Sequence, residues 1–287
     1  MGEINNKIKI AMIGAAGKIG QRITNNLLKE DYNILLCEKG EGKDKITKKG
    51  FKVYDAEEGI QQADITIMVV PDDKMQEISN HLIPLAKPDS IIMALDAGAP
   101  YAGEFKLRDD CTFVVSHPCH PPLFREQDTL EARRDLFGGV AGKQDIVIAL
   151  LSGKEEKFEL AKKISIEMFA PVINCFRLTV EQIAYMEPAA TEVVALSAVY
   201  IIREALDTVI KQGVPKEAAR AFMLGHLNCI LDHIFKGTNP TSDASKIAME
   251  YGLERIYKSD WKEVLKPESI KQALQKMLHP TKKSTII

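Results

Sequence analysis

The chain has 287 residues, of which 45% are hydrophobic and 27% charged, and its formal net charge is −2. This length favours two domains, and the composition is that of an ordinary globular protein rather than a disordered or fibrous one. The basic residues are scattered, which argues against a nucleic-acid partner. No apolar run has the length of a membrane span or the pattern of a signal peptide, so we expect a cytoplasmic protein with no membrane partner. The five cysteines are an odd number and widely spaced, which favours free thiols over disulfides.

The N-terminal half alternates apolar runs with amphipathic stretches. A buried strand is predicted at Lys7–Ile13, then a glycine-rich turn, then a helix at Lys18–Lys29 with one apolar face. Further strands are expected at Asn33–Cys37, Asp64–Val70, Ser90–Leu95, Thr112–Ser116 and Asp145–Leu151, and helices at Asp72–Leu85 and Glu155–Met168. This alternation predicts an α/β fold with a doubly wound parallel sheet.

The pattern changes after Arg177, and no convincing strand follows. Thr179 and Gln182 have the spacing of a capping box, and helical character then extends to Gln212. The stretch Val193–Ile202 is apolar nearly all round, which predicts a helix buried on all sides. We therefore expect a Rossmann domain over residues 1–178 and an all-helical domain over 179–287 that serves the substrate and a homodimer contact.

Three glycines mark a nucleotide site between the first strand and the first helix. Gly14 permits a tight turn, Gly17 lets the backbone approach a pyrophosphate, and Gly20 permits close packing of the helix on the strand. The free N–H groups at the helix N-terminus would bind the phosphate. The cofactor-binding residues predicted from this turn are Gly14, Ala15, Ala16, Gly17, Lys18 and Ile19.

Glu38 follows the second strand, where a carboxylate can accept hydrogen bonds from both ribose hydroxyls of NAD and would repel the 2′-phosphate of NADP. Nearby lysines keep NADP open as an alternative. Val70 and Asp72 follow the strand Asp64–Val70 and are predicted to line the nucleotide pocket. For Asp72 the alternative is an ordinary helix N-cap.

A proline-rich segment, His117-Pro118-Cys119-His120-Pro121-Pro122, directly follows the strand Thr112–Ser116. Its two histidines are expected on a stiff loop beyond the sheet edge. They could hold a divalent metal, act as acid and base, or bind a substrate carboxylate. The alternative is a rigid surface turn without chemistry.

Glu187 is an acid within an otherwise apolar helical stretch, immediately before Pro188. The proline should kink the helix at this point. The alternative role for Glu187 is to complement a helix dipole if the helix begins at Pro188. Our hypothesis is that His117 and Glu187 meet across the domain cleft as ligands of a divalent metal such as zinc or magnesium, with His120 as the catalytic acid or base.

Taken together, these motifs resemble the superfamily of 6-phosphogluconate and β-hydroxyacid dehydrogenases, in which a Rossmann domain precedes a helical domain. Gln62-Ala63-Asp64, Val70-Pro71 and the segment Glu204–Val214 carry the resemblance. One departure is that no lysine occurs between Thr179 and Ile210, where ordinary members have a catalytic lysine. Oxidation of a hydroxyacid by the usual lysine route is therefore not expected.

The phosphate turn, the segment Ser116–Pro122 and Glu187-Pro188 look more like the D-apionate oxidoisomerase branch of that superfamily. The resemblance implies NAD-dependent oxidation of D-apionate, a branched sugar acid, at its 2-hydroxyl, followed by an α-ketol shift to 3-oxo-isoapionate in carbohydrate catabolism. A divalent metal at His117 and Glu187 would suit such a shift. The alternatives are an NAD(P)-dependent hydroxyacid dehydrogenase without rearrangement and a non-catalytic NAD-binding sensor.

Overall fold

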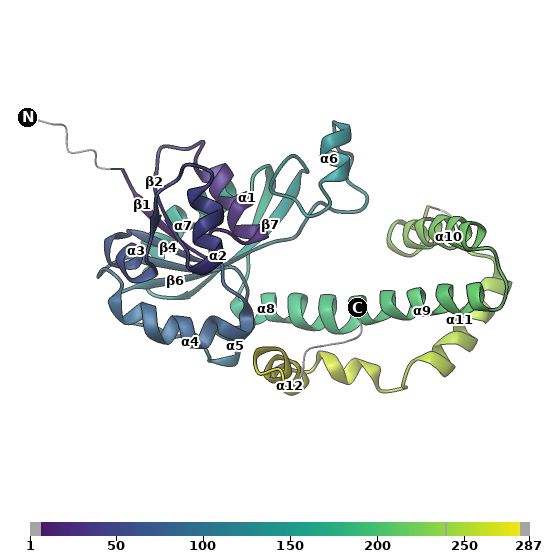
Figure 1. Ribbon diagram of the computed structural model, residues 1–287. Helices are drawn as coiled ribbons and strands as arrows, with labels where there is room; N and C mark the ends of the chain where they lie inside the picture. The colour runs from purple at the N-terminus through teal and green to yellow at the C-terminus, as the bar shows by residue number, and fades with distance from the viewer. Residues whose placement is uncertain (1–6, 239, 282–287) are drawn as a thin grey trace, which may run out of the picture. The chain divides into compact units, whose positions relative to one another are not determined.

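The computed structural model describes residues 7–238 and 240–281, and its first part contains an eight-stranded sheet (Figure 1). The strand order is β3-β2-β1-β4-β5-β6-β7-β8. The strands are β1 (Lys9–Ile13), β2 (Asn33–Cys37), β3 (Val53–Tyr54), β4 (Ile65–Met68), β5 (Ile91–Ala94), β6 (Thr112–Pro118), β7 (Gln144–Ser152) and β8 (Val172–Arg177). Neighbouring strands are parallel except β6 and β7, which are antiparallel. The predicted doubly wound sheet is confirmed, with this one reversal.

Helices occur in the connections between successive strands. They are α1 (Lys18–Leu27), α2 (Gly40–Thr47), α3 (Ala56–Gln62), α4 (Asp72–Leu82), α5 (Gly98–Ala102), α6 (Leu130–Arg134) and α7 (Phe158–Met168). The predicted helices Asp72–Leu85 and Glu155–Met168 each include a short 3-10 turn, at Ile83–Leu85 and at Glu155–Lys157. The sequence patterns did not predict β3, β8, α2, α3, α5 or α6, each of which has at most eight residues.

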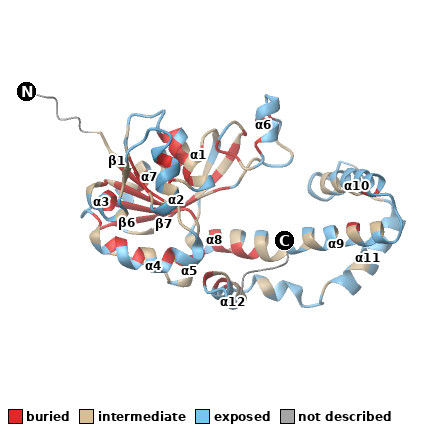
Figure 2. Ribbon diagram, viewed as in Figure 1, coloured by how far each residue is buried: buried red, intermediate tan, exposed pale blue. Residues whose placement is uncertain are grey.

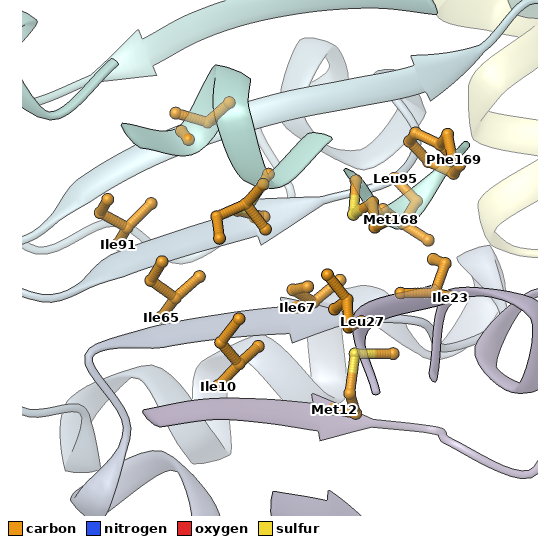
Figure 3. Close-up of a cluster of buried hydrophobic side chains, with 14 of the residues drawn as sticks. Ile10, Met12, Ile23, Leu27, Ile65, Ile67, Ile91, Leu95, Met168 and Phe169 are labelled. Carbon is orange, nitrogen blue, oxygen red and sulfur yellow. The ribbon is translucent and has the colours of Figure 1, made fainter. Parts of the chain in front are cut away.

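A cluster of buried hydrophobic side chains lies between the sheet and the helices α1 and α7, which pack against each other (Figure 3). Ile10, Ile67 and Ile91 extend from the strands towards this layer, and Ile23 and Leu27 face them from α1. Fully burying one such side chain stabilises the fold by about 1.5–3 kcal/mol. This layer fixes α1 against β1 and so holds the glycine turn between them.

The chain divides into two compact units at a different place from the predicted boundary. The described residues up to Glu187 form one unit together with those from Lys271 onward, and Pro188–Ile270 form the other. Helix α12 (Pro267–Leu278) explains the difference, because Leu274 is fully buried beside Gly98 and Gln275 donates a hydrogen bond to Glu104. The boundary near residue 178 is thus corrected to Glu187, and most of the last helix belongs with the sheet.

In the described residues after β8, the secondary structure consists of helices joined by turns. After α8 (Val180–Ala184), which begins with the predicted Thr179–Gln182 capping box, come a π-helix (Tyr185–Leu196), α9 (Ser197–Lys211), α10 (Lys216–Lys236), α11 (Asp243–Ile256) and a 3-10 turn (Trp261–Leu265). The prediction that Val193–Ile202 is buried on all sides is wrong for the single chain, since Leu196 and Val199 are 52% and 60% exposed. Figure 2 shows α9 mainly in the colours of intermediate and exposed residues. Within one chain, too few apolar neighbours cover this helix.

Two further expectations concern the whole chain. All five cysteines are free, as their spacing predicted. None of the helices in residues 7–238 and 240–281 is both long and apolar enough to cross a membrane.

Candidate functional site

The glycine turn lies at the carboxyl end of β1, as predicted. Gly14 has a φ of +90°, and a Cβ at this position would lie 2.0 Å from the carbonyl oxygen of Val69. A Cβ at Gly20 would lie 2.4 Å from the carbonyl oxygen of Gly14. At Gly17 a Cβ would only touch the Gly14 oxygen at 3.5 Å, an ordinary contact. The fold itself therefore requires Gly14 and Gly20, whereas Gly17 keeps open the space in front of the turn.

This difference gives a test of the turn. Replacing Gly17 by alanine is expected to change the free energy of unfolding by less than about 1 kcal/mol, but to weaken NAD binding about tenfold or more because the methyl group occupies the path of the pyrophosphate. Gly20→Ala should instead destabilise the fold by about 1–3 kcal/mol through overpacking. Urea denaturation and NAD titration calorimetry of both variants check this, and equal effects of both changes on stability would contradict it.

Beside the turn is a cavity of about 690 Å³, lined by Gly14, Gly17, Glu38 and Val70 together with residues of α3 and α4. A cavity of this size suits a small-molecule ligand. Glu38 extends from the end of β2, and its two carboxylate oxygens accept hydrogen bonds from the backbone N–H groups of Ala16 and Lys39 at 2.8 and 3.1 Å. The candidate ribose ligand is thus fixed to the turn. Ile19 packs against the core, so only its backbone can take part in cofactor binding.

Asp72 lies at the start of α4, directly after Pro71, which lines the cavity. It is the first residue of α4, whose N-cap is Pro71, so the N-cap alternative is wrong. The described residues lining the cavity do not include it. Burial of its carboxyl, with the neighbouring carboxylate of Asp96, raises the pKa of Asp72 to about 6, and His117 opposes this shift. The pKa of Asp72 therefore depends on the charges of the residues around His117.

A raised carboxyl pKa makes stability depend on pH. The pKa of Asp72 is about 6 in the folded protein and has its ordinary value of 3.8 in the unfolded chain. At a pH between these two values, the native protein keeps a proton on Asp72 that the unfolded chain has released. Stability therefore falls as pH rises through this window. We expect Asp72→Asn to raise the free energy of unfolding relative to wild type more at pH 7 than at pH 4, measured by urea denaturation with a chelator present. The exposed Asp109→Asn serves as control, and a pH-independent difference for Asp72→Asn would contradict this.

His117 lies in a strand rather than on the predicted loop. It belongs to β6 and pairs with Val147 of β7, because the antiparallel return of β7 extends the hydrogen-bonded strand as far as Pro118. Its Nδ1 is 2.6 Å from the carbonyl oxygen of Leu95. A carbonyl can only accept, so Nδ1 carries a proton and donates this hydrogen bond, and Nε2 is the nitrogen left to bind a cation or to exchange a proton. Sheet pairing and this hydrogen bond together fix the direction of the ring.

Glu187 lies beside His117, within the same compact unit. Its Oε2 is 3.5 Å from His117 Nε2, and that nitrogen is buried with no hydrogen-bond partner among the described residues. On the other side of the ring, Asp96 Oδ2 lies 3.9 Å from Nδ1. Glu187 belongs to the π-helix, which also contains Pro188 and replaces the predicted α-helical kink. π-Helical segments often occur at functional sites.

His120 has a φ of +62°, a left-handed conformation that is uncommon for residues other than glycine. Its Nδ1 donates to the carbonyl oxygen of Phe137 at 2.8 Å, which leaves the lone pair on Nε2, and its ring centroid lies 6.2 Å from that of His117. The two predicted histidines are therefore neighbours, and Nδ1 of each is held by a backbone carbonyl. Sequence reasoning missed Asp96 and Phe137, since neither belongs to a motif around the histidines.

Two family models match the chain. That of the C-terminal domain of decarboxylating phosphogluconate dehydrogenase matches residues 125–278. That of the NADPH-binding domain of acetohydroxy acid isomeroreductase matches residues 4–98.

Curated relatives and solved structures also match nearly the whole length. D-apionate oxidoisomerase from Blautia hydrogenotrophica is 39% identical over 282 residues, covering 96% of this chain and 98% of the relative. D-apionate oxidoisomerase from Cupriavidus necator is 40% identical over 274 residues, covering 94% and 99%. The crystal structure of a semialdehyde dehydrogenase NAD-binding protein from Cupriavidus necator, in complex with calcium and NAD, superposes with a TM-score of 0.90 at 40% identity, covering 94% of this chain and 99% of that one.

Proposed function

Because the chain belongs to the D-apionate oxidoisomerase family, we propose that it oxidises D-apionate with NAD and rearranges the product to 3-oxo-isoapionate. The cofactor half of this proposal is supported by the open turn at Gly17, by the fixed carboxylate of Glu38, and by the NAD in the similar structure from Cupriavidus necator. A cytoplasmic location and a role in carbohydrate catabolism are part of the same proposal.

The observation that carries the chemical half is the pair His117 and Glu187. His117 Nε2 lies 3.5 Å from Glu187 Oε2, and an imidazole nitrogen and a carboxylate oxygen this close need a proton or a cation between them. Nitrogen and oxygen ligands bound to one tetrahedral zinc at about 2.1 Å each lie about 3.4 Å apart. The donor set thus fits a divalent cation, and the calcium in the similar structure from Cupriavidus necator supports one.

The described residues contain no group of three or more His, Cys, Asp or Glu side chains arranged around a metal. His117 and Glu187 would therefore leave coordination positions for the oxygens of the sugar acid. When bound, a divalent cation would polarise the ketone and stabilise the neighbouring alkoxide. The Leu95 carbonyl, by fixing the His117 tautomer, is the kind of outer partner that orients metal-binding histidines.

The proposed reaction has two steps. In the first, the C2 hydride leaves for the nicotinamide and the 2-hydroxyl loses its proton to Nε2 of His120. In the second, the 3-hydroxyl loses its proton, the hydroxymethyl group moves from C3 to C2 with its bonding electron pair, C3 becomes the ketone, and the 2-oxygen takes up a proton. His120 is suited to hold these protons because its Nδ1–H is already fixed to the Phe137 carbonyl.

An assay with NAD and D-apionate, with and without a chelator, tests this function. We expect NADH to form and 3-oxo-isoapionate to be identified by NMR as the product. Both NADH formation and the product should be lost when the chelator is present. An unrearranged keto acid would instead identify a hydroxyacid dehydrogenase. Tight NADH binding without turnover on any branched sugar acid would identify a sensor, and turnover unaffected by the chelator would remove the metal.

We further propose that the protein is a homodimer through its helical unit. In the described part of Pro188–Ile270 the buried side chains are few and mostly small: Pro188, Ala189, Leu206, Ala219 and Ile270. Large apolar side chains on the same helices are exposed, among them Phe222 at 69% and Phe235 at 73%. Helices in water derive most of their stability from covering such faces. A second copy of the unit would present a matching apolar surface.

Light scattering after size-exclusion chromatography is expected to give the mass of two chains of 31.9 kDa each. Replacing both Phe222 and Ile234 by glutamate should shift this to the mass of one chain and reduce helicity, because burying the new charges costs several kcal/mol. Phe51→Glu, at a similarly apolar but unrelated surface position, serves as control. A wild-type chain that stays monomeric at micromolar concentration would contradict the dimer.

A further inference from the structure

Phe137 joins the two halves of the proposed site. Its ring lies under the ammonium of Lys18, with Nζ 3.8 Å from the ring centroid, and the guanidinium of Arg22 is 5.1 Å away. The ring of His120 packs against it at 4.9 Å between centroids. Lys18 begins the helix that follows the phosphate turn, whereas His120 follows β6. One side chain therefore touches both a candidate phosphate ligand and the candidate acid or base.

The backbone of Phe137 also holds His120. Its carbonyl oxygen accepts the Nδ1 proton of His120 at 2.8 Å, so the same residue fixes the imidazole tautomer and supports the ring face. His120 needs such support because its φ of +62° is an unfavourable conformation. Without it, the ring would have other rotamers and the other tautomer available.

The segment around Phe137 is itself firmly anchored. The buried Asp135 carboxylate accepts hydrogen bonds from the backbone N–H groups of Val140, Ala141 and Gly142 at 3.0–3.1 Å. The side chain of Asn26, on the same face of α1 as Lys18 and Arg22, donates to the carbonyl of Gly139 at 3.2 Å. This loop is therefore fixed to the phosphate-binding helix along three of its turns.

We propose that Phe137 is a positioning residue that fixes His120 for proton transfer, holds Lys18 beside the phosphate turn, and so couples cofactor binding to His120. The inference rests on the proposed function, because it takes His120 as the acid or base. The pyrophosphate of NAD attracts Lys18, and the cation lies on the ring that supports the histidine, so occupancy of the turn changes the surroundings of His120.

The main test is Phe137→Leu, which keeps the backbone carbonyl and removes the ring. We expect kcat to fall about 10- to 100-fold through misplacement of His120, with the KM for the sugar acid changed less than about twofold. The dissociation constant for NAD should rise about two- to fivefold, the range of one exposed cation–π contact. Phe137→Tyr keeps the ring and should restore both values, and Phe51→Leu should match wild type.

Two readouts separate positioning from a general loss of structure. In a Lys18→Met background, Phe137→Leu should no longer change NAD affinity, since the shared contact is already lost. In NMR spectra of the imidazole nitrogens, assigned with a His120→Gln variant, NAD should shift the His120 signals in wild type and not in Phe137→Leu. A wild-type kcat in Phe137→Leu, or His120 signals that respond equally to NAD in both proteins, would overturn the inference. If His120→Gln itself retains turnover, the proposed role of His120 fails instead.

Discussion

Glu187→Gln is expected to lower kcat/KM for D-apionate by about 100-fold or more while the protein remains folded. The carboxylate faces the lone pair of His117 Nε2 at 3.5 Å, and an amide N–H in its place can donate to that nitrogen. The variant thus gives the buried His117 Nε2 a hydrogen-bond donor and removes the negative charge that a cation needs. Metal content by mass spectrometry and NADH formation measure the two effects.

The thermal midpoint adds a second measure. In the presence of a chelator, Glu187→Gln should unfold at the same temperature as wild type or a higher one, because an unpaired acceptor has been satisfied. Glu181→Gln, an exposed acid of α8 that hydrogen-bonds Tyr185, is the matched control. Unchanged turnover and unchanged metal content in Glu187→Gln would exclude this residue from the site.

His120→Gln is expected to lower kcat about 10²- to 10⁴-fold, the usual contribution of a general acid or base. Glutamine keeps a polar side chain of similar reach but cannot take up a proton. Affinity for NAD should change little, because the turn and Glu38 are unaltered. Rapid mixing under single-turnover conditions isolates the chemical step. His226→Gln, on α10, provides a control, and a kcat within threefold of wild type for His120→Gln would exclude its role in proton transfer.

The sheet was predictable because its signals are local. Each long strand is an apolar run between polar turns, so Asn33–Cys37 was predicted to the residue. The antiparallel direction of β7 could not be predicted, because it depends on the path of residues 119–143, which have no periodic pattern. That reversal extends β6 through His117 and places this histidine in a rigid strand.

The helical unit shows a different limit. Its apolar faces were visible in the sequence, but a hydrophobic pattern indicates that a face is covered and not which chain covers it. Val193–Ile202 was expected to be buried on all sides, whereas the single chain leaves Val199 60% exposed. The return of α12 to the sheet depends on contacts of Leu274 and Gln275 with residues that are distant in sequence.

For the site, composition of the motifs was enough to bring together His117, His120 and Glu187 as candidates. The groups that fix the two histidine rings could not be predicted from the sequence, because Leu95 and Phe137 act through backbone carbonyls that any residue possesses. The π-helix was also missed.

The carboxylate of Glu38 has a consequence for engineering the cofactor preference. Exchanges at this position are the obvious route from NAD to NADP, since they remove the charge that repels a 2′-phosphate. In this protein Oε1 of Glu38 also accepts a hydrogen bond from the Ala16 N–H of the phosphate turn at 2.8 Å. A single substitution would therefore alter selectivity and loosen the turn at once. A productive redesign needs a second change that supplies Ala16 with a new acceptor.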